Sequence, residues 1–268
     1  MKPVRQAAAF LRRDLLLQSS YRSAFVLNIV GIFFTVAIFY YLGQVFRTHL
    51  SDRIREPDYF SFVLVGIAFY NYLGTALNSF SGSLRQAQLT GTLEPVLATP
   101  VGIPTLLLGS ALYHFLYTSL TALAYLAIAA LFFGLDLSRA NGGAVLVTLL
   151  LTILAFSALG ILSAAFTLVW KRGDPLAFLL GSASALLGGV YFPATVLPAW
   201  LQSIAAWIPL TYALSAMRQS LIGGTPLRGV APDLWKLALF AAVLIPLSVA
   251  AFSAALARAR RDGSLAQY

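Results

Sequence analysis

Residues 143–170 read GAVLVTLLLTILAFSALGILSAAFTLVW and contain no charged side chain. A helix that crosses the hydrocarbon core of a bilayer needs about 20 mostly apolar residues, so this stretch is long enough to span a membrane. Five further stretches have a similar character, although the fourth of them is short: 24–46, 59–83, 102–134, 175–192 and 234–257. The sequence therefore predicts an all-α integral membrane protein with six transmembrane helices.

The composition supports this fold class. Of the 268 residues, 59% are hydrophobic and only 10% are charged, whereas a soluble domain is roughly 45–50% apolar and about 25% charged. The mean hydropathy is +0.83. So few charged side chains cannot cover a soluble surface, which excludes an ordinary soluble enzyme, a disordered regulator and a DNA-binding domain. The net charge of +9 therefore does not indicate a nucleic-acid partner.

A seventh apolar stretch, about 191–222, is interrupted by prolines. Proline removes a backbone donor and clashes with the preceding helical turn, so we expect short re-entrant helices at the outer membrane edge instead of a span. Aromatic side chains in this segment suit the headgroup layer. The alternative is an anchored loop without substrate contact. The residues of interest are Tyr191, Phe192, Pro193, Leu197, Pro198, Trp200, Pro209 and Tyr212.

The distribution of basic residues indicates the orientation. With six spans both termini lie on one side, and a cytoplasmic N-terminus places eleven Lys and Arg residues inside and seven, Arg218 among them, outside. Cytoplasmic segments carry the excess of Lys and Arg. A span at 193–222 would move Arg258, Arg260 and Arg261 outside. We therefore expect a multi-pass protein of the inner or plasma membrane with both termini in the cytoplasm.

Residues 1–22 form a separate segment from the membrane domain, 23–268. Val4, Ala8, Leu11 and Leu15 fall on one face of a helix, which predicts an amphipathic helix in the inner headgroup layer. The alternative is a positively charged flank that only orients the first span. No cleavable signal peptide is expected, because no apolar run ends here in a small-residue cleavage site.

Residues that carry enzyme chemistry are scarce. The chain has no Cys, two His and nine acids, and all nine acids fall in loops or at span ends. It also has no G-x-x-x-x-G-K-[ST] phosphate loop. Ion-driven carriers usually keep an ionisable group inside the membrane. We therefore expect no catalytic, metal-ligating or cofactor-binding residue on this chain, and an energy source on a partner.

Polar residues recur at helical spacing inside three spans. In two of the spans the spacing is i, i+4 and i+7, and in the first span it is i, i+3 and i+7. The stripes also contain Gly31, Gly82, Thr121 and Tyr125. One interpretation is that they line a translocation path. The alternative is hydrogen bonding between helices, worth about 0.6 kcal/mol on average per contact, and for His114 alone a structural role is favoured. The candidate pathway residues are Asn28, Thr35, Asn71, Thr75, Asn78, His114 and Thr118.

Two further patterns concern packing and docking. Ala177, Gly181, Ala185 and Gly189 are small residues four apart, which lets helix backbones approach closely, either in a dimer seam or within the chain. The inner connector, about 84–100, reads LRQAQLTGTLEPVLATP. Its prolines are start and stop signals, so it could be a short helix that docks into a groove of a cytosolic partner, or an ordinary connector.

Together these motifs resemble the ABC type-2 transporter permease family. The connector resembles its coupling-helix signature, and the segment from Tyr191 to Tyr212 resembles its signature after the fifth span. The resemblance implies the membrane subunit of a type V exporter. Two permease subunits, in a homodimer, would then bind two copies of a cytosolic ATPase that holds ATP and Mg. The implied ATPase-coupling residues are Gly91, Thr92, Leu93, Glu94, Thr99 and Pro100.

The expected function is thus that of an exporter permease that moves a lipophilic or glycan-type substrate out of the cytoplasm with energy from the ATPase. A self-sufficient channel or secondary carrier is the alternative, and the lack of intramembrane acids counts against a carrier. A membrane-embedded transferase acting on a lipid carrier is a further alternative. Such enzymes need acids or His clustered at a membrane face, whereas the acids of this chain are scattered.

Overall fold

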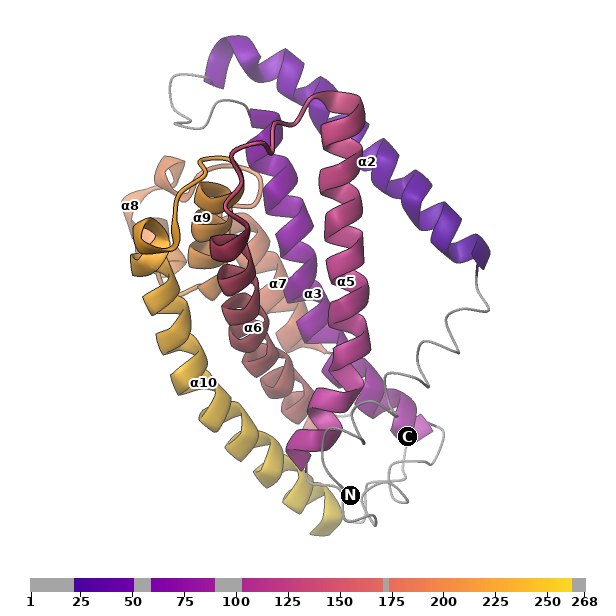
Figure 1. Ribbon diagram of the computed structural model, residues 1–268. Coiled ribbons are helices and arrows are strands. Elements are labelled where there is room, and N and C mark those ends of the chain that lie inside the picture. The colour runs from indigo at the N-terminus through magenta and orange to yellow at the C-terminus, as the bar shows by residue number, and fades with distance from the viewer. Residues whose placement is uncertain (1–21, 51–58, 90–102, 171–173, 262–268) are drawn as a thin grey trace.

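The computed structural model describes residues 22–50, 59–89, 103–170 and 174–261. Within these ranges every regular element is a helix, so the predicted all-α fold is confirmed (Figure 1). The long helices are α2 (Arg22–Leu50), α3 (Tyr59–Leu89), α5 (Ile103–Phe133), α6 (Gly142–Trp170) and α10 (Leu227–Arg261). The shorter helices are α7 (Pro175–Leu187), the 3-10 turn η1 (Ala194–Val196), α8 (Ala199–Ala205) and α9 (Pro209–Leu221).

Five helices of the described residues are long and apolar enough to cross a membrane. Their apolar portions reproduce the predicted first four spans and the last one: Val26–Val45, Tyr59–Ser83, Ala111–Phe133, Gly142–Trp170 and Leu227–Ala259. The predicted span 175–192 is shorter than expected, since α7 has 13 residues, or about 20 Å at 1.5 Å per residue. It ends before Gly189, whose φ of +81° is incompatible with a continuing helix.

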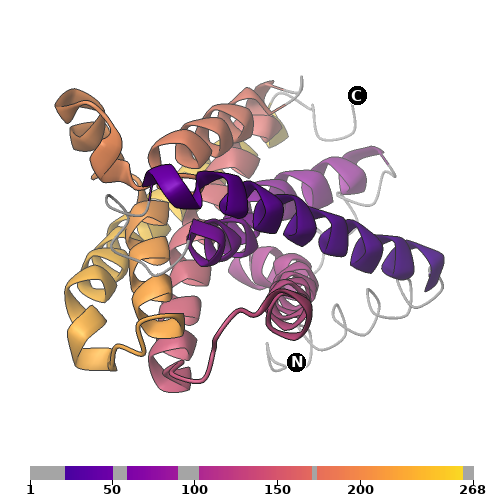
Figure 2. The same cartoon turned by 90° about the horizontal axis from the view of Figure 1, so that it is seen from above.

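α6 lies at the centre of the bundle, with α3 and α10 packed along it and α5 on the other side of α3 (Figures 1 and 2). α2 lies at the edge and contacts α3 and α5. α3 and α6 approach closely at Gly160. A Cβ at Gly160 would overlap with the carbonyl oxygen of Ala76 and the ring of Phe80. Glycine therefore determines how close these two helices lie.

The proline-rich segment after α7 forms short helices, as predicted. Pro193 and Pro198 cap η1 and α8, and Pro209 is at the start of α9. α9 buries one face, including Leu214 and Met217, neither of which is exposed at all. The segment is thus anchored to the bundle through α9, while its placement at the outer membrane edge stays a prediction.

Arg218 of α9 is buried and joins three parts of the fold. Its Nε and Nη2 donate to the carbonyl oxygen of Phe62 in α3 at 3.1 and 3.0 Å. Nη2 also donates to the carbonyl oxygens of Gly189 at 2.8 Å and Val190 at 3.3 Å. The guanidinium carbon lies 3.4 Å from the centroid of the Phe62 ring. There is room for this arrangement because residue 66 is glycine. A side chain at this position would place its Cβ on the carbonyl of Val190.

Arg218 is one of the seven basic residues that the sequence assigns to outer segments. Its side chain is 5% exposed and lies between helices. The predicted orientation, with both termini in the cytoplasm, stays a prediction.

Two predicted elements fall mostly outside the described residues. The N-terminal interfacial helix, 1–22, lies outside them up to residue 21. Of the connector 84–100, residues 84–89 continue α3 to Leu89, and the rest lies outside the described residues.

Replacing Gly160 by valine should push α3 away from α6. We expect Gly160→Val to lower the free energy of unfolding by about 1–3 kcal/mol, the usual range for overpacking a core. Denaturation of the purified protein in detergent measures this. Gly82→Val is the matched control, because a Cβ there meets nothing within 4 Å. Equal losses in the two variants would contradict the close contact.

Replacing Arg218 by methionine preserves much of its length but removes every donor. Hydrogen bonds to charged groups contribute about 1.5–3 kcal/mol, so Arg218→Met should lower the free energy of unfolding by about 3 kcal/mol or more. The control is Arg228→Met, since Arg228 is exposed at the start of α10. The same denaturation midpoint in both variants would be incompatible with the bridging role.

Candidate functional site

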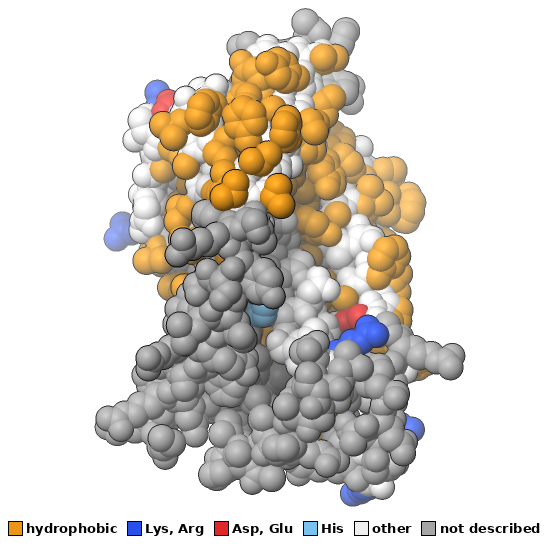
Figure 3. All heavy atoms as spheres, turned by 90° about the vertical axis from the view of Figure 1, so that its right-hand side faces the viewer, with side chains coloured by type: hydrophobic (Ala, Val, Ile, Leu, Met, Phe, Trp, Pro, Cys, Tyr) orange, Lys and Arg blue, Asp and Glu red, His pale blue; other side chains and the backbone are white. Residues whose placement is uncertain are grey.

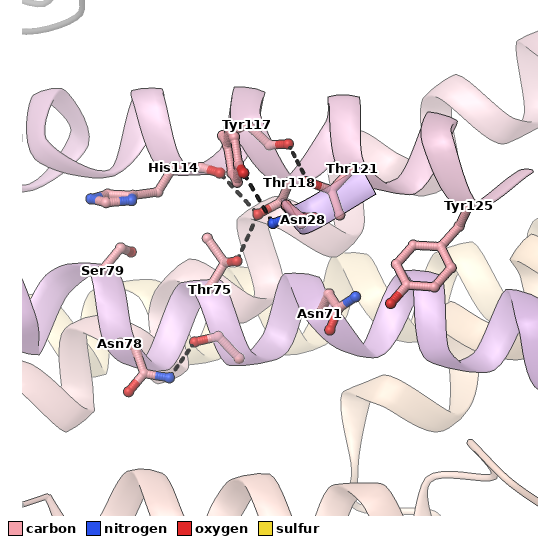
Figure 4. Close-up of a pocket in the computed structure, with 11 residues that line it drawn as sticks. Asn28, Asn71, Thr75, Asn78, Ser79, His114, Tyr117, Thr118, Thr121 and Tyr125 are labelled. Carbon is pink, nitrogen blue, oxygen red and sulfur yellow. Dashed lines mark hydrogen bonds between the residues drawn. The ribbon is translucent and has the colours of Figure 1, made fainter. Parts of the chain in front are cut away.

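A cavity of about 520 Å³ opens between α2, α3 and α5. Figure 4 shows its polar walls, and in Figure 3 an imidazole is visible in a recess of the surface. Six of the seven predicted pathway residues line it. Thr35 does not line it; its hydroxyl donates to the carbonyl of Gly31 in its own helix at 2.9 Å. The lining residues are Asn28, Asn71, Gly74, Thr75, Asn78, Ser79, His114, Tyr117, Thr118, Thr121 and Tyr125.

The α3 wall presents one helical face to the cavity. Asn71, Thr75 and Asn78 are spaced at i, i+4 and i+7, and residues at these spacings lie on the same side of a helix. The Asn78 amide donates to the carbonyl of Gly74 at 2.8 Å. Ser79 is 6% exposed, and its hydroxyl forms no hydrogen bond with the described residues.

The α5 wall faces the α3 wall, and two hydroxyls join the two walls. The Oγ1 atoms of Thr75 and Thr118 are 2.6 Å apart. Thr118 Oγ1 also donates to the carbonyl of His114 at 2.9 Å. A hydroxyl has one proton, so Thr75 donates to Thr118. On the same interface the Tyr72 hydroxyl donates to Ser119 at 3.0 Å.

α2 reaches the cavity through Asn28. The Asn28 amide donates to the Tyr117 hydroxyl of α5 at 3.1 Å, so one residue of α2 closes part of the rim. Further along α2, the ring of Phe33 lies 5.8 Å from that of Phe132. These contacts attach α2 to α5, although much of its surface remains exposed.

The polar stripes contain residues with and without a partner in another helix. The Thr75–Thr118 and Asn28–Tyr117 bonds are interhelical, as the packing interpretation expects. By contrast, neither the Ser79 hydroxyl nor the Asn71 amide forms a hydrogen bond with the described residues. Their polar groups remain for water or a solute. Within the described part of the chain, the lining contains amides, hydroxyls and an imidazole but neither a carboxylate nor a Lys or Arg.

Three lining residues, Gly74, Ser79 and Tyr117, were not predicted. Ser79 is four residues after Thr75, and Tyr117 is three residues after His114, so both belong to the same helical faces. The spacing could have identified Ser79. The bond between Tyr117 and Asn28 depends on how α2 packs against α5, which no spacing reveals.

The residues of the outer segment lie apart from the cavity. Tyr191 stacks on Phe39 of α2 with ring centroids 6.3 Å apart. The Tyr212 hydroxyl donates to the carbonyl of Ala206 at 2.8 Å. Trp200 is 65% exposed. This exposure suits the predicted contact with a headgroup layer.

The small-residue face of α7 takes part in packing within the chain. The Tyr70 hydroxyl of α3 donates to the carbonyl of Gly181 at 3.2 Å. Ala177 packs against the core, and Ala185 is half-buried. Gly189 is not on the helix, which ends at Leu187. The face is therefore shorter than the sequence suggested.

The described carboxylates lie away from the cavity. Asp174 caps α7 by accepting from the backbone N–H of Ala177 at 2.8 Å, and it also accepts from the Ser163 hydroxyl. Hydrogen bonds from the hydroxyl and the backbone N–H of Ser138 lower the pKa of Asp136. Among the described residues no three His, Asp or Glu side chains cluster to hold a metal. The predicted coupling residues 91–100 lie outside the described residues.

Parts of this chain are similar in sequence to known membrane proteins. A stretch of 125 residues is 31% identical to heme exporter protein B of Haemophilus influenzae and covers 47% of this chain and 56% of that relative. A stretch of 185 residues is 23% identical to the inner membrane transport permease YadH of Escherichia coli K12, covering 67% of this chain and 70% of the relative. Shigella flexneri YadH matches equally.

The family model for ABC-2 type transporters matches residues 5–222. This range includes the three helices around the cavity, the proline-rich connector and the short helices up to α9. Helices able to cross a membrane and these relatives together support a multi-pass membrane protein. The chain belongs to the ABC-2 type transporter family, a family of membrane permeases.

Proposed function

We propose that this chain is the permease subunit of an ABC exporter that moves a lipophilic or glycan-type substrate out of the cytoplasm. The energy comes from ATP, held with Mg by a separate ATPase. The family match and the polar cavity support this proposal. In this proposal the chain has six spans. α7 belongs to the fifth span, and the short helices after it form a re-entrant outer segment. The protein lies in the inner membrane, with both termini in the cytoplasm.

The observation that carries the mechanism is the chain connection between the cavity walls. α3 ends at Leu89, α5 begins at Ile103, and these two helices form facing walls. The coupling residues 91–100 lie in the connector between them. A force that an ATPase exerts on this connector therefore acts on both walls at once. The Thr75–Thr118 hydrogen bond, worth about 1 kcal/mol, offers little resistance to a separation of the two walls.

A second copy of the chain would cover α2. Several apolar side chains of α2 are more than half exposed although the helix contacts α3 and α5. The cavity also opens toward α2, where Asn28 and Asn78 are exposed. A homodimer with two ATPase copies would enclose the cavity between its two permease subunits. The exposed side chains are Val26, Leu27, Phe34, Ile38, Tyr41 and Val45.

The coupling role of the connector is tested with Glu94. In a reconstituted complex with its ATPase, Glu94→Ala should lower transport-coupled ATP hydrolysis about tenfold, the loss expected from about 1.4 kcal/mol. Glu56→Ala, in the connection between α2 and α3, is the matched control and should leave the rate unchanged. Co-purification of an ATPase is the first measurement. Full transport by the chain alone, with no ATPase present, would overturn the proposal.

Water access to the cavity can be tested directly because the chain has no cysteine. Asn71→Cys should react with a membrane-impermeant thiol reagent at least about tenfold faster than Leu120→Cys, since the reactive thiolate forms where water reaches the sulfur. Leu120 is 62% exposed on α5 but does not line the cavity. Labelling of Asn71→Cys should change when ATP and vanadate trap the complex. Equal, slow labelling of both positions would rule out an aqueous path here.

A further inference from the structure

We propose that the apolar groove between α7 and α10 binds an acyl chain of an anionic phospholipid, whose phosphate is held by Lys236. This site lies apart from the cavity between α2, α3 and α5, and nothing in its geometry depends on an ATPase. Only the assignment of the groove to the outer leaflet rests on the proposed function, because that function places both termini in the cytoplasm.

The groove has a volume of about 410 Å³, within the range of about 300–1,000 Å³ typical of small-molecule sites. Leu159 of α6 and Leu180 of α7 contribute to its lining, and Trp207 stands between α8 and α9. The α10 side consists of Leu239, Phe240, Val243 and Leu244. Since this lining is almost wholly apolar, the occupant must present hydrocarbon to it.

A cation lies close to the α10 side of the groove. Lys236 Nζ is 4.5 Å from the centroid of the Tyr212 ring. That ring in turn lies 6.1 Å from the ring of Phe240, which lines the groove. Lys236 and Phe240 are four residues apart and share a helix face. The ammonium group is thus connected to the groove through two aromatic rings.

The charge of Lys236 is not compensated by the described carboxylates. Asp233, three residues earlier on α10, accepts from the Gln219 amide at 3.2 Å. No described carboxylate forms an ion pair with Lys236. The apolar part of α10 begins directly after this residue. An ammonium in this position favours an anion, and its cation–π contact with Tyr212 leaves its charge in place.

The order of groups along α10 is that of a phospholipid. Trp235 is 74% exposed and Trp207 80% exposed, as indole rings are at the headgroup layer. Lys236 follows, and the apolar lining extends from Leu239 to Leu244. From Lys236 to Leu244 the helix rises about 12 Å at 1.5 Å per residue. Along α10 the cation and the apolar groove therefore follow one another as the phosphate and the acyl chain do in a phospholipid, with the indole rings beside the cation.

The test uses the full-length chain purified in a mild detergent and native mass spectrometry. The protein is incubated with equal amounts of phosphatidylglycerol and phosphatidylcholine, and the fraction that carries each lipid is measured. Lys236→Gln removes the cation, and Leu239→Trp fills the groove. The matched controls are Arg228→Gln, which removes a cation of α10 outside the groove, and Leu131→Trp at an exposed position of α5.

We expect the unmodified chain to retain phosphatidylglycerol in preference to phosphatidylcholine. Lys236→Gln should lower phosphatidylglycerol retention about fivefold, the usual contribution of one lysine at an anionic lipid surface, and Leu239→Trp should lower retention of both lipids. Neither control should change retention. Equal retention of both lipids, or equal loss in Arg228→Gln and Lys236→Gln, would overturn the proposal. So would a disulfide between two copies of the chain that carry Leu239→Cys, because a second copy would then fill the groove.

Discussion

Backbone carbonyls released within a membrane protein need donors, and Arg218 supplies them. After α7 ends at Leu187, the carbonyls of Gly189 and Val190 have left the helical ladder. In hydrocarbon such groups are tolerated only where protein satisfies them. The Arg218 guanidinium does this and binds Phe62 of α3 as well. One side chain thereby holds the break after α7, the start of α3 and the short helix α9 together.

This arrangement shapes both faces of the bundle. α9 packs between α3, α6 and α10, so α7 and α10 stand apart and leave the apolar groove between them. On the other side, α5 and α2 pack on α3 without covering its polar face completely, and the polar cavity results. α3 and α6 separate these two sites, and their distance from each other depends on Gly160. The permease thus presents an apolar and a polar recess on different sides of one closely packed helix pair.

Much of the fold was predictable because membrane helices can be recognised in a sequence by their length and hydropathy. The stretches 59–83 and 143–170 agree with the observed spans to within a residue. α7 was harder, because the residues after Gly189 are as apolar as those of the helix. Its end depends on a positive φ at Gly189 and on carbonyl partners that come from Arg218, 28 and 29 residues away. The amino-acid composition of this segment reveals neither the positive φ nor the contact with Arg218.

The cavity was predictable in part for a related reason. Helical periodicity placed Asn71, Thr75 and Asn78 on one face and His114 and Thr118 on another, and these faces do meet. The sequence by itself thus determined which segments are helical, which faces are polar and that the chain carries no phosphate loop, since these follow from local residue order. Only the tertiary structure decided which faces meet, that Thr35 lies away from the cavity, and that Arg218 is buried, because these depend on contacts between residues far apart in the chain.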